Sequence, residues 1–261
     1  MKRYRAILTG ASGGIGREIA KALAPHCEEL LLVGRNAQRL AETAAAAGPV
    51  ARTLVADLAT PAGRDAASLP GINLLVNNAG AGDFAWLEGQ SDATLERIVE
   101  TNVLAPMQLT RRLLPELKRR PEAWIVNVGS IMGYLGYPGY AAYCASKFAL
   151  RGFSEALRRE LADGPVRVLY LAPRATRTEM NGAGACALNT ELGVAMDEPA
   201  VVARELLALL ARPARERLIG MPERLFARLN QLVPGLIDRA LWRKLPIIRR
   251  HAPASPKEDL P

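Results

Sequence analysis

Apolar and polar positions follow two alternating patterns along most of the chain. Short, nearly continuous apolar runs predict buried β-strands, at residues 4–10, 29–35, 50–57, 72–80, 123–130, 166–173 and 216–220. The segments between them carry apolar residues at helical spacing and predict helices, at residues 13–26, 36–48, 61–69, 91–118, 140–162 and 198–212. Apolar strands that alternate with helices are typical of a parallel sheet covered on both faces. We therefore predict an α/β fold, a single doubly wound Rossmann-type domain with a central parallel sheet of about seven strands.

The pattern changes near residue 220. Between residues 221 and 251 the apolar side chains fall on two helical stripes separated by Pro234, and seven basic residues stand against two acidic ones. We predict a domain at residues 1–220, a basic amphipathic helical extension at 221–251 and a disordered tail at 252–261. Such an extension can pack on the domain, cover a pocket, form a subunit interface or make peripheral contact with an anionic membrane.

The net charge of +8 raises the question of a nucleic-acid partner. The basic residues sit in scattered pairs on predicted helices, with no aromatic platform among them, so we expect no nucleic acid. Two histidines and three cysteines without a CxxC pair lack metal-ligand spacing, so we expect no metal site. The odd number of cysteines argues against a disulfide framework and favours a cytoplasmic location.

The first predicted strand ends in a glycine-rich turn, "TGASGGIG" at residues 9–16. Gly10, Gly14 and Gly16 at a strand-to-helix junction let the main chain approach a pyrophosphate at the helix N-terminus. At the end of the second strand, where NAD-binding proteins of this architecture usually carry an acidic residue, the chain has Gly34 and Arg35. Because an arginine can pair with a 2′-phosphate, the sequence predicts NADP(H) rather than NAD(H).

Four polar residues are candidates for catalysis. Tyr143 and Lys147 in "YCASK" are four positions apart, so they share one face of a helix. Ser130 ends the fifth strand, and Asn102 lies in the long helix before it. Each could by itself be a cap, a half-buried aromatic or a solvated charge. Because strand ends in such sheets face the ligand crevice, each of the four residues has a route to the same site.

The order and spacing of these motifs resemble the short-chain dehydrogenase/reductase family. The resemblance rests on "TGASGGIG", Asp57 after the third strand, "NNAG" at residues 77–80 and the four catalytic candidates, and it covers residues 5–220. The glycine spacing or the Tyr–Lys pair would each be a weak signal alone, whereas the full set is specific.

The resemblance implies a role for each of the four residues. Tyr143 would be the general acid in carbonyl reduction, or the base in alcohol oxidation. Lys147 and the charge of the nicotinamide would lower the pKa of that tyrosine, and Lys147 would also bind the nicotinamide ribose. Ser130 would hydrogen-bond the substrate oxygen, and Asn102 would hold a water that links Lys147 to solvent. The implied cofactor-binding residues are Gly10, Ser12, Gly14, Ile15, Gly16, Arg35, Asp57, Leu58, Asn78, Ala79, Gly80, Tyr143, Lys147, Pro173, Thr176 and Thr178.

The chain departs from the family after the sixth strand. Arg174 follows Pro173 where the family usually has glycine, so we expect a cation near the substrate entrance. It would engage an acidic group on the substrate or in the following loop, or simply face solvent. By its position in the family, the segment at residues 179–198 would be the substrate lid. The apolar side chains expected around the substrate are Phe84, Leu135 and Tyr137.

The sequence therefore predicts an NADP(H)-dependent oxidoreductase that moves hydride between nicotinamide and a carbonyl or secondary alcohol of a lipophilic small molecule. Two alternatives stay open: a regulatory protein that senses NADPH without turnover, and an epimerase or dehydratase on the same scaffold. The resemblance also implies a homodimer or homotetramer.

Overall fold

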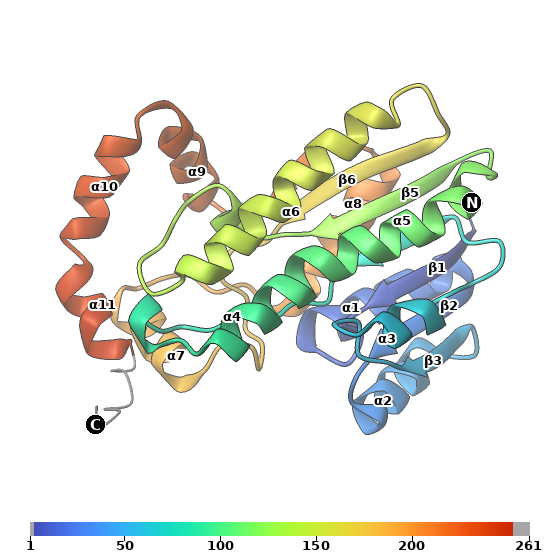
Figure 1. The fold of residues 1–261 in the computed structure, drawn as a ribbon, viewed down its shortest axis with the longest axis horizontal. Helices are drawn as coiled ribbons and strands as arrows, with labels where there is room; N and C mark the ends of the chain where they lie inside the picture. The colour runs from blue at the N-terminus through green and yellow to red at the C-terminus, as the bar shows by residue number, and fades with distance from the viewer. Residues whose placement is uncertain (1–2, 253–261) are drawn as a thin grey trace.

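A computed structural model describes residues 3–252 of the chain. Its centre is a parallel sheet of seven strands in the order β3-β2-β1-β4-β5-β6-β7 (Figure 1). The strands are β1 (Tyr4–Thr9), β2 (Cys27–Gly34), β3 (Ala51–Val55), β4 (Leu74–Asn77), β5 (Ala123–Val128), β6 (Val166–Ala172) and β7 (Glu216–Leu218). The predicted doubly wound α/β fold is confirmed. The predicted tail lies outside the described residues, apart from Ala252.

The chain starts in the middle of the sheet. It builds β2 and β3 outward on one side of β1, then returns to place β4 on the other side. The strand order reverses between β1 and β4, and ligands of such sheets bind at the carboxyl ends of the strands at this point. Because all strands are parallel, the residues that follow β1, β4, β5 and β6 gather at one edge.

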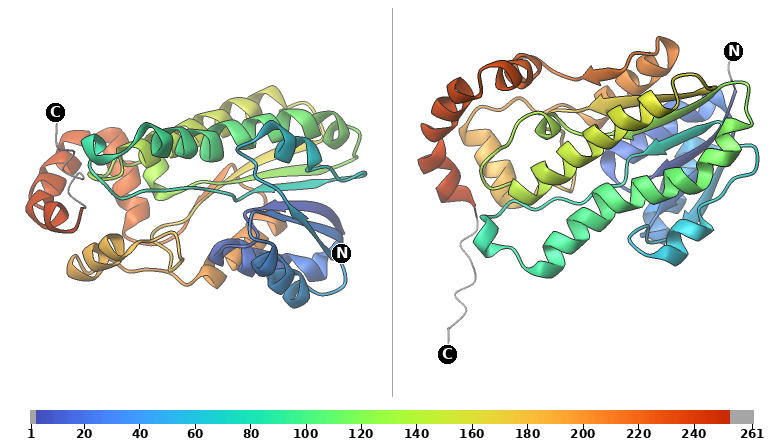
Figure 2. Two further views of the ribbon diagram at one scale, coloured as in Figure 1. Left: turned by 60° about the horizontal axis from the view of Figure 1, so that its bottom comes forward. Right: turned by 45° about the horizontal axis from the view of Figure 1, so that its top comes forward.

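Helices cover both faces of the sheet because alternate side chains of each strand point to opposite sides. Leu8 of β1 packs toward α1 (Gly14–Leu23), α2 (Ala37–Ala47) and α8 (Pro199–Ala211). Its neighbour Ile7 packs toward the other face, in a cluster with α5 (Ala105–Lys118) and α6 (Ala141–Glu160), and α3 (Pro61–Ala66) lies beside α5. Figure 2 shows the two helical layers with the sheet between them.

The predicted helix at residues 91–118 is interrupted. Ser91 caps α4 (Asp92–Val99) by accepting a hydrogen bond from the Thr94 main-chain N–H. A π-helical segment, Glu100–Leu104, then joins α4 to α5, and the Ala105 N–H reaches five residues back to the Glu100 carbonyl. Such π segments are rare and occur frequently at functional sites. Asn102 lies inside this one.

Buried side-chain amides join the helices to the sheet. Asn77 of β4 donates to Asn127 Oδ1 of β5 at 2.8 Å and to Thr110 Oγ1 of α5 at 3.2 Å. Asn127 in turn donates to Ser154 Oγ of α6 at 2.8 Å. Fully satisfied buried networks of this kind fix one packing geometry. They hold the helices that carry Asn102, Tyr143 and Lys147 against the strands.

Two segments beyond the sheet differ in detail from their predictions. The substrate segment, residues 179–198, contains the helix α7 (Ala183–Glu191). The C-terminal extension, residues 221–251, forms three helices where two stripes were expected: α9 (Glu223–Leu232), α10 (Pro234–Trp242) and α11 (Leu245–His251). They lie together at one end of the molecule (Figures 1 and 2). Within residues 3–252, every helix is too short or too polar to cross a bilayer.

Candidate active site

The turn after β1 is built for close approach of main chain. Gly10 has a φ of 67°, and a Cβ there would lie 2.7 Å from the Ala79 Cα. A Cβ on Gly16 would lie 2.1 Å from the Gly10 carbonyl oxygen. The following helix α1 begins without a side-chain cap, which leaves its first N–H groups available to an anion.

Thr9 ties this turn to the end of β4. Its hydroxyl oxygen accepts hydrogen bonds from the main-chain N–H groups of Asn78 and Ala79, at 2.9 and 3.0 Å. The Asn78 side chain donates to the Thr9 and Gly10 carbonyl oxygens at 3.0 and 3.3 Å. The ends of β1 and β4 are therefore locked together at the point where the strand order reverses.

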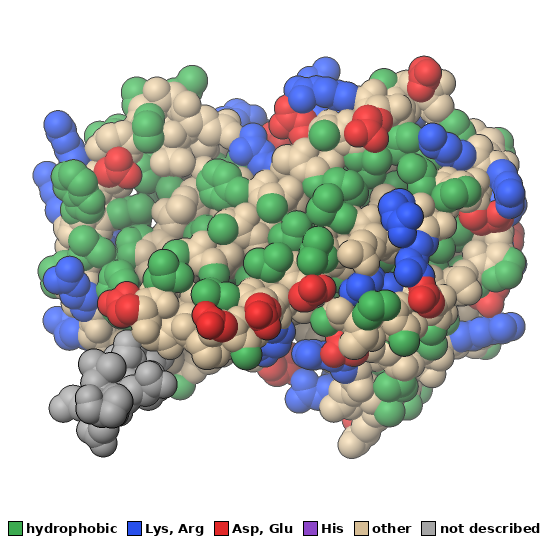
Figure 3. All heavy atoms as spheres, viewed as in Figure 1, with side chains coloured by type: hydrophobic (Ala, Val, Ile, Leu, Met, Phe, Trp, Pro, Cys, Tyr) green, Lys and Arg blue, Asp and Glu red, His purple; other side chains and the backbone are tan. Residues whose placement is uncertain are grey.

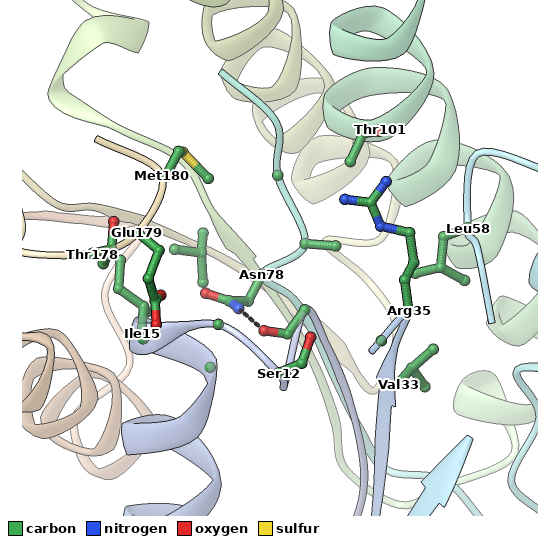
Figure 4. A pocket seen from close by; sticks show the side chains of 18 of the residues that line it. Ser12, Ile15, Val33, Arg35, Leu58, Asn78, Thr101, Thr178, Glu179 and Met180 are labelled. Atoms are coloured by element: carbon green, nitrogen blue, oxygen red, sulfur yellow. Dashed lines mark hydrogen bonds between the residues drawn. The ribbon is translucent and has the colours of Figure 1, made fainter. Parts of the chain in front are cut away.

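A first cavity, of about 260 Å³, runs along these strand ends. Figure 4 shows Arg35 and Leu58 at one end, Ser12 and Asn78 in the middle, and Thr178, Glu179 and Met180 at the other. It is lined by most of the predicted cofactor-binding residues: Gly10, Ser12, Gly14, Ile15, Gly16, Arg35, Asp57, Leu58, Asn78, Ala79, Gly80, Tyr143, Lys147 and Thr178. Pro173 and Thr176 line a second, adjoining cavity instead.

Lys147 carries its ammonium group into the protein interior. Its side chain is only 4% exposed, and Nζ makes one long hydrogen bond, 3.4 Å to the Val128 carbonyl oxygen. Nζ lies 5.5 Å from the centre of the Tyr143 ring, within the range of a cation–π contact. An ammonium has three N–H donors, so this buried group can donate further hydrogen bonds to a ligand in the first cavity, for example to ribose hydroxyls.

Burial shifts the pKa values of Lys147 and Tyr143 in the directions that favour the neutral form of each group. Desolvation lowers the pKa of Lys147 to about 8. Desolvation raises the pKa of Tyr143 to about 12, although a hydrogen bond with Ser130 acts in the opposite direction. The protein by itself therefore keeps Tyr143 protonated, whereas the sequence analysis expected Lys147 and the nicotinamide together to lower this pKa. A protonated phenol is the form that can donate a proton.

Asn102 uses its side chain to hold the chain after β4. Its amide nitrogen donates to the Ala81 carbonyl at 2.8 Å and to Ser146 Oγ at 2.9 Å, and its oxygen accepts from the Ala81 N–H at 2.7 Å. Ser146 donates in turn to the Tyr143 carbonyl oxygen at 2.7 Å. Asn102, which lines neither cavity, thus connects the π segment to the helix of Tyr143. Ser146 was missed in the sequence, although it lies within "YCASK".

The second cavity holds about 600 Å³ and meets the first at Tyr143. Ser130 lies at this junction, two residues beyond the end of β5. Side chains expected around the substrate line it, namely Phe84, Leu135 and Tyr137. The C-terminal extension, whose role the sequence left open, contributes a further wall of this cavity. That wall consists of Glu223, Phe226, Ile237, Ala240, Leu241 and Lys244.

Arg174 joins the substrate segment to the C-terminal extension. Its guanidinium binds Asp197 through two hydrogen bonds of 3.0 and 2.7 Å, and Glu223 through one of 3.2 Å. It also donates to the Met221 carbonyl oxygen at 3.2 Å. Of the options expected for Arg174, the geometry matches an acidic group in the loop, because Asp197 lies in the substrate segment. At the far end of the extension, Arg250 pairs with Glu191 of α7.

Several residues of the first cavity went unnoticed in the sequence. Val33 and Ala56 sit at the ends of β2 and β3, and the parallel arrangement of the strands could have indicated both. Glu179 and Met180 belong to the substrate segment and carry no motif. Thr101 lines the cavity in place of its neighbour Asn102.

The chain is similar in sequence to proteins of one known family. The sequence profile of the family described as short chain dehydrogenase matches residues 4–185. Dehydrogenase/reductase SDR family member 7B of Bos taurus is 31% identical over 258 residues, which cover 90% of this chain and 79% of that protein.

Solved structures of similar proteins contain either dinucleotide. A short-chain dehydrogenase/reductase from Burkholderia phymatum in complex with NAD is 25% identical, with a TM-score of 0.80 and coverage of 90% of this chain and 94% of that one. A short-chain dehydrogenase from Sphingobium yanoikuyae in complex with NADPH is 26% identical, with a TM-score of 0.76 and coverage of 91% and 96%.

Replacing Lys147 by methionine should stabilise the protein in a pH-dependent way. Below about pH 8 the folded protein buries Lys147 as a cation. Between about pH 8 and the ordinary lysine pKa of 10.5, Lys147 is protonated in the unfolded chain but neutral in the folded protein, so the stability of the wild type rises with pH. Lys147→Met should raise the free energy of unfolding at neutral pH by roughly 1–3 kcal/mol, and this gain should shrink toward pH 10.5. Chemical denaturation across pH measures it. Lys118→Met, at an exposed lysine, is the control. An equal increase in its free energy of unfolding would contradict the assignment of the effect to burial of the Lys147 cation.

Replacing Arg174 by alanine should loosen the cover of the second cavity. Asp197 and Glu223 would lose their partner while remaining largely buried, so the free energy of unfolding should fall by about 1–3 kcal/mol. KM should rise to the same degree for acidic and neutral carbonyl substrates, as steady-state kinetics would measure. Arg177→Ala, which breaks an exposed pair with Glu198, should change little. A KM increase confined to acidic substrates would show instead that Arg174 binds the substrate.

Proposed function

The chain belongs to the short-chain dehydrogenase/reductase family of oxidoreductases, and we propose that it is an NADP(H)-dependent reductase of carbonyl groups on lipophilic small molecules. One observation carries the proposal. Tyr143, beside the buried Lys147 ammonium and the Ser130 hydroxyl, lies where the first cavity meets the larger, mainly apolar second one. A proton donor is thereby available to whatever occupies both cavities.

The residues of the first cavity fit a dinucleotide. The turn at Gly10 and Gly16 has no room for a Cβ, and the N-terminus of α1 is open toward an anion. Lys147 would hold the nicotinamide ribose, because its buried ammonium has donors to spare. When bound, the nicotinamide supplies hydride to the carbonyl carbon or removes it.

The side chains of the chain itself would supply the rest of the chemistry. Ser130 would donate a hydrogen bond to the carbonyl oxygen and orient it toward Tyr143. The raised pKa of Tyr143 keeps its proton in place until the oxygen becomes basic, and Tyr143 would then donate it. Lys147 would stabilise the resulting phenolate. Because the side chain of Asn102 is engaged with Ala81 and Ser146, the relay water would bind its main-chain carbonyl.

The preference for NADP(H) over NAD(H) rests on Arg35. It follows the last residue of β2, is exposed, lines the first cavity and has no ion-pair partner within residues 3–252. The acidic residue that would bind ribose hydroxyls is missing at this strand end. A 2′-phosphate would supply the counter-charge that this guanidinium lacks.

The homodimer or homotetramer expected from the sequence is also a proposal. Met107 on α5 and Phe148 on α6 are exposed, on two helices that lie next to each other (Figures 1 and 2). Apolar side chains on adjacent helices can form a subunit interface, and light scattering would measure the number of subunits.

The unpaired Cys27, Cys144 and Cys186 support the cytoplasmic location.

Oxidation of NADPH in the presence of aldehydes, ketones and diketones tests the proposed reaction. Tyr143→Phe removes the hydroxyl that would donate the proton, so kcat should fall by about 10²–10⁴-fold, whereas the Kd for NADPH should change far less. Tyr140→Phe is the matched control, because Tyr140 also lines the second cavity, and it should keep its turnover. Wild-type protein that binds NADPH but turns over no carbonyl would favour the sensing role instead.

Replacing Arg35 by aspartate should exchange the cofactor preference. The Kd for NADPH should rise about tenfold, because a charge-assisted contact with the 2′-phosphate becomes a repulsion. Binding of NADH should stay equal or tighten, since a carboxylate there can accept hydrogen bonds from ribose hydroxyls. Fluorescence titration with both cofactors measures the change, with Arg52→Asp on β3 as control. Equal affinities of the wild type for NADPH and NADH would contradict the assignment.

A further inference from the structure

The C-terminal extension has an apolar surface in addition to the face that it turns to the cavity. More than half of the exposed large apolar side chains within residues 3–252 lie on it. Leu232 is 79% exposed and Trp242 65%, although neither lines the cavity. These exposed side chains are Met221, Leu225, Phe226, Leu232, Val233, Leu236 and Trp242.

Basic residues are interspersed with this apolar surface. Six of them find no ion-pair partner among the described residues 3–252, whereas the acidic Glu223 is already bound by Arg174. Figure 3 shows lysine and arginine side chains beside apolar ones at the end of the molecule where α10 and α11 lie. The six are Arg224, Arg228, Arg239, Arg243, Lys244 and Arg249.

The excess of basic residues distinguishes between two partners for this surface, a second copy of the chain and an anionic bilayer. In a twofold dimer the same patch meets itself, so an excess of basic residues would face an equal excess across the interface. An anionic phospholipid surface supplies the opposite charge, and its interface accommodates apolar side chains and the amphipathic ring of tryptophan. The composition of the patch therefore favours a bilayer over a second copy of the chain.

The second cavity opens at the same helices. Phe226, Ala240 and Lys244 line it and are also exposed, so they mark an opening on the C-terminal extension. On α10, Ile237, Ala240 and Leu241 share the face toward the cavity, and Lys244 lines it from the turn between α10 and α11. A lipophilic molecule that enters here would pass between apolar surfaces.

We propose that α9 and α10 dock on an anionic phospholipid bilayer, with the opening of the second cavity toward the lipid. Apolar side chains insert into the interface, and the arginines bind lipid phosphates. A substrate dissolved in the bilayer reaches Tyr143 without crossing water. The route of the substrate rests on the proposed function, whereas the docking does not.

Sedimentation of the full chain with vesicles tests the docking without cofactor or substrate. The wild type should bind vesicles of phosphatidylcholine mixed with phosphatidylglycerol, and binding should weaken in high salt and with phosphatidylcholine alone. Arg239→Gln/Arg243→Gln should lower the partition coefficient about tenfold or more. Leu232→Ser/Leu236→Ser/Trp242→Ser should lower it comparably. Arg111→Gln/Arg167→Gln, the same loss of charge on α5 and β6, should leave it unchanged.

Thermal unfolding and turnover of a water-soluble carbonyl should be unaltered in all of these variants, because none of the residues lines either cavity. With a carbonyl substrate dissolved in the vesicles, the wild type should be faster than the two extension variants. Absence of wild-type binding, or equal loss in the Arg111/Arg167 control, would overturn the proposal. So would a wild-type dimer that the apolar variant converts to monomers while neither protein binds vesicles.

Discussion

A lysine ammonium held out of water beside a tyrosine phenol is the constraint on which the site depends. Lys147 is almost completely buried, and one long hydrogen bond to a main-chain carbonyl does not compensate its desolvation. Burying this cation costs stability, so the surrounding fold has to hold it rigidly, and its remaining donors suit a ligand that completes its hydrogen bonds. The amide network of Asn77 and Asn127, which fixes α5 and α6 on the sheet, provides that rigidity.

The two cavities are built by different kinds of structure. The first lies along strand ends, where Thr9 and Asn78 lock β1 to β4 and glycines leave no side chain in the turn after β1. The second is enclosed largely by the substrate segment and the C-terminal extension, which are tied together at Arg174. Loops and helices outside the sheet tolerate change more easily than strand ends do. The scaffold thus separates a first cavity built on rigid strand ends from a second cavity whose walls can vary.

The same three helices of the C-terminal extension have two uses for apolar surface. On α10, one side completes the second cavity through Ile237 and Leu241, while Leu236 and Trp242 remain exposed. An amphipathic helix that only packed on its own domain would leave charged residues on its outer face. The outer face of this extension instead mixes exposed apolar and basic residues, and this mixture is the basis of the proposed docking on a bilayer.

The sequence alone determined the doubly wound sheet and indicated the glycine-rich turn and the pairing of Tyr143 with Lys147 on one helix face, because strand periodicity, glycine turns and helical spacing are local properties. It could not determine the π segment around Asn102, the two ion pairs of Arg174 or the helices over the second cavity. Those depend on contacts between residues far apart in the chain. The pKa of Tyr143 is the clearest case. The resemblance implied that Lys147 and a bound nicotinamide together lower this pKa, whereas burial in the protein by itself raises it. Desolvation opposes the charged form, and only the tertiary structure determines how much water remains around the phenol.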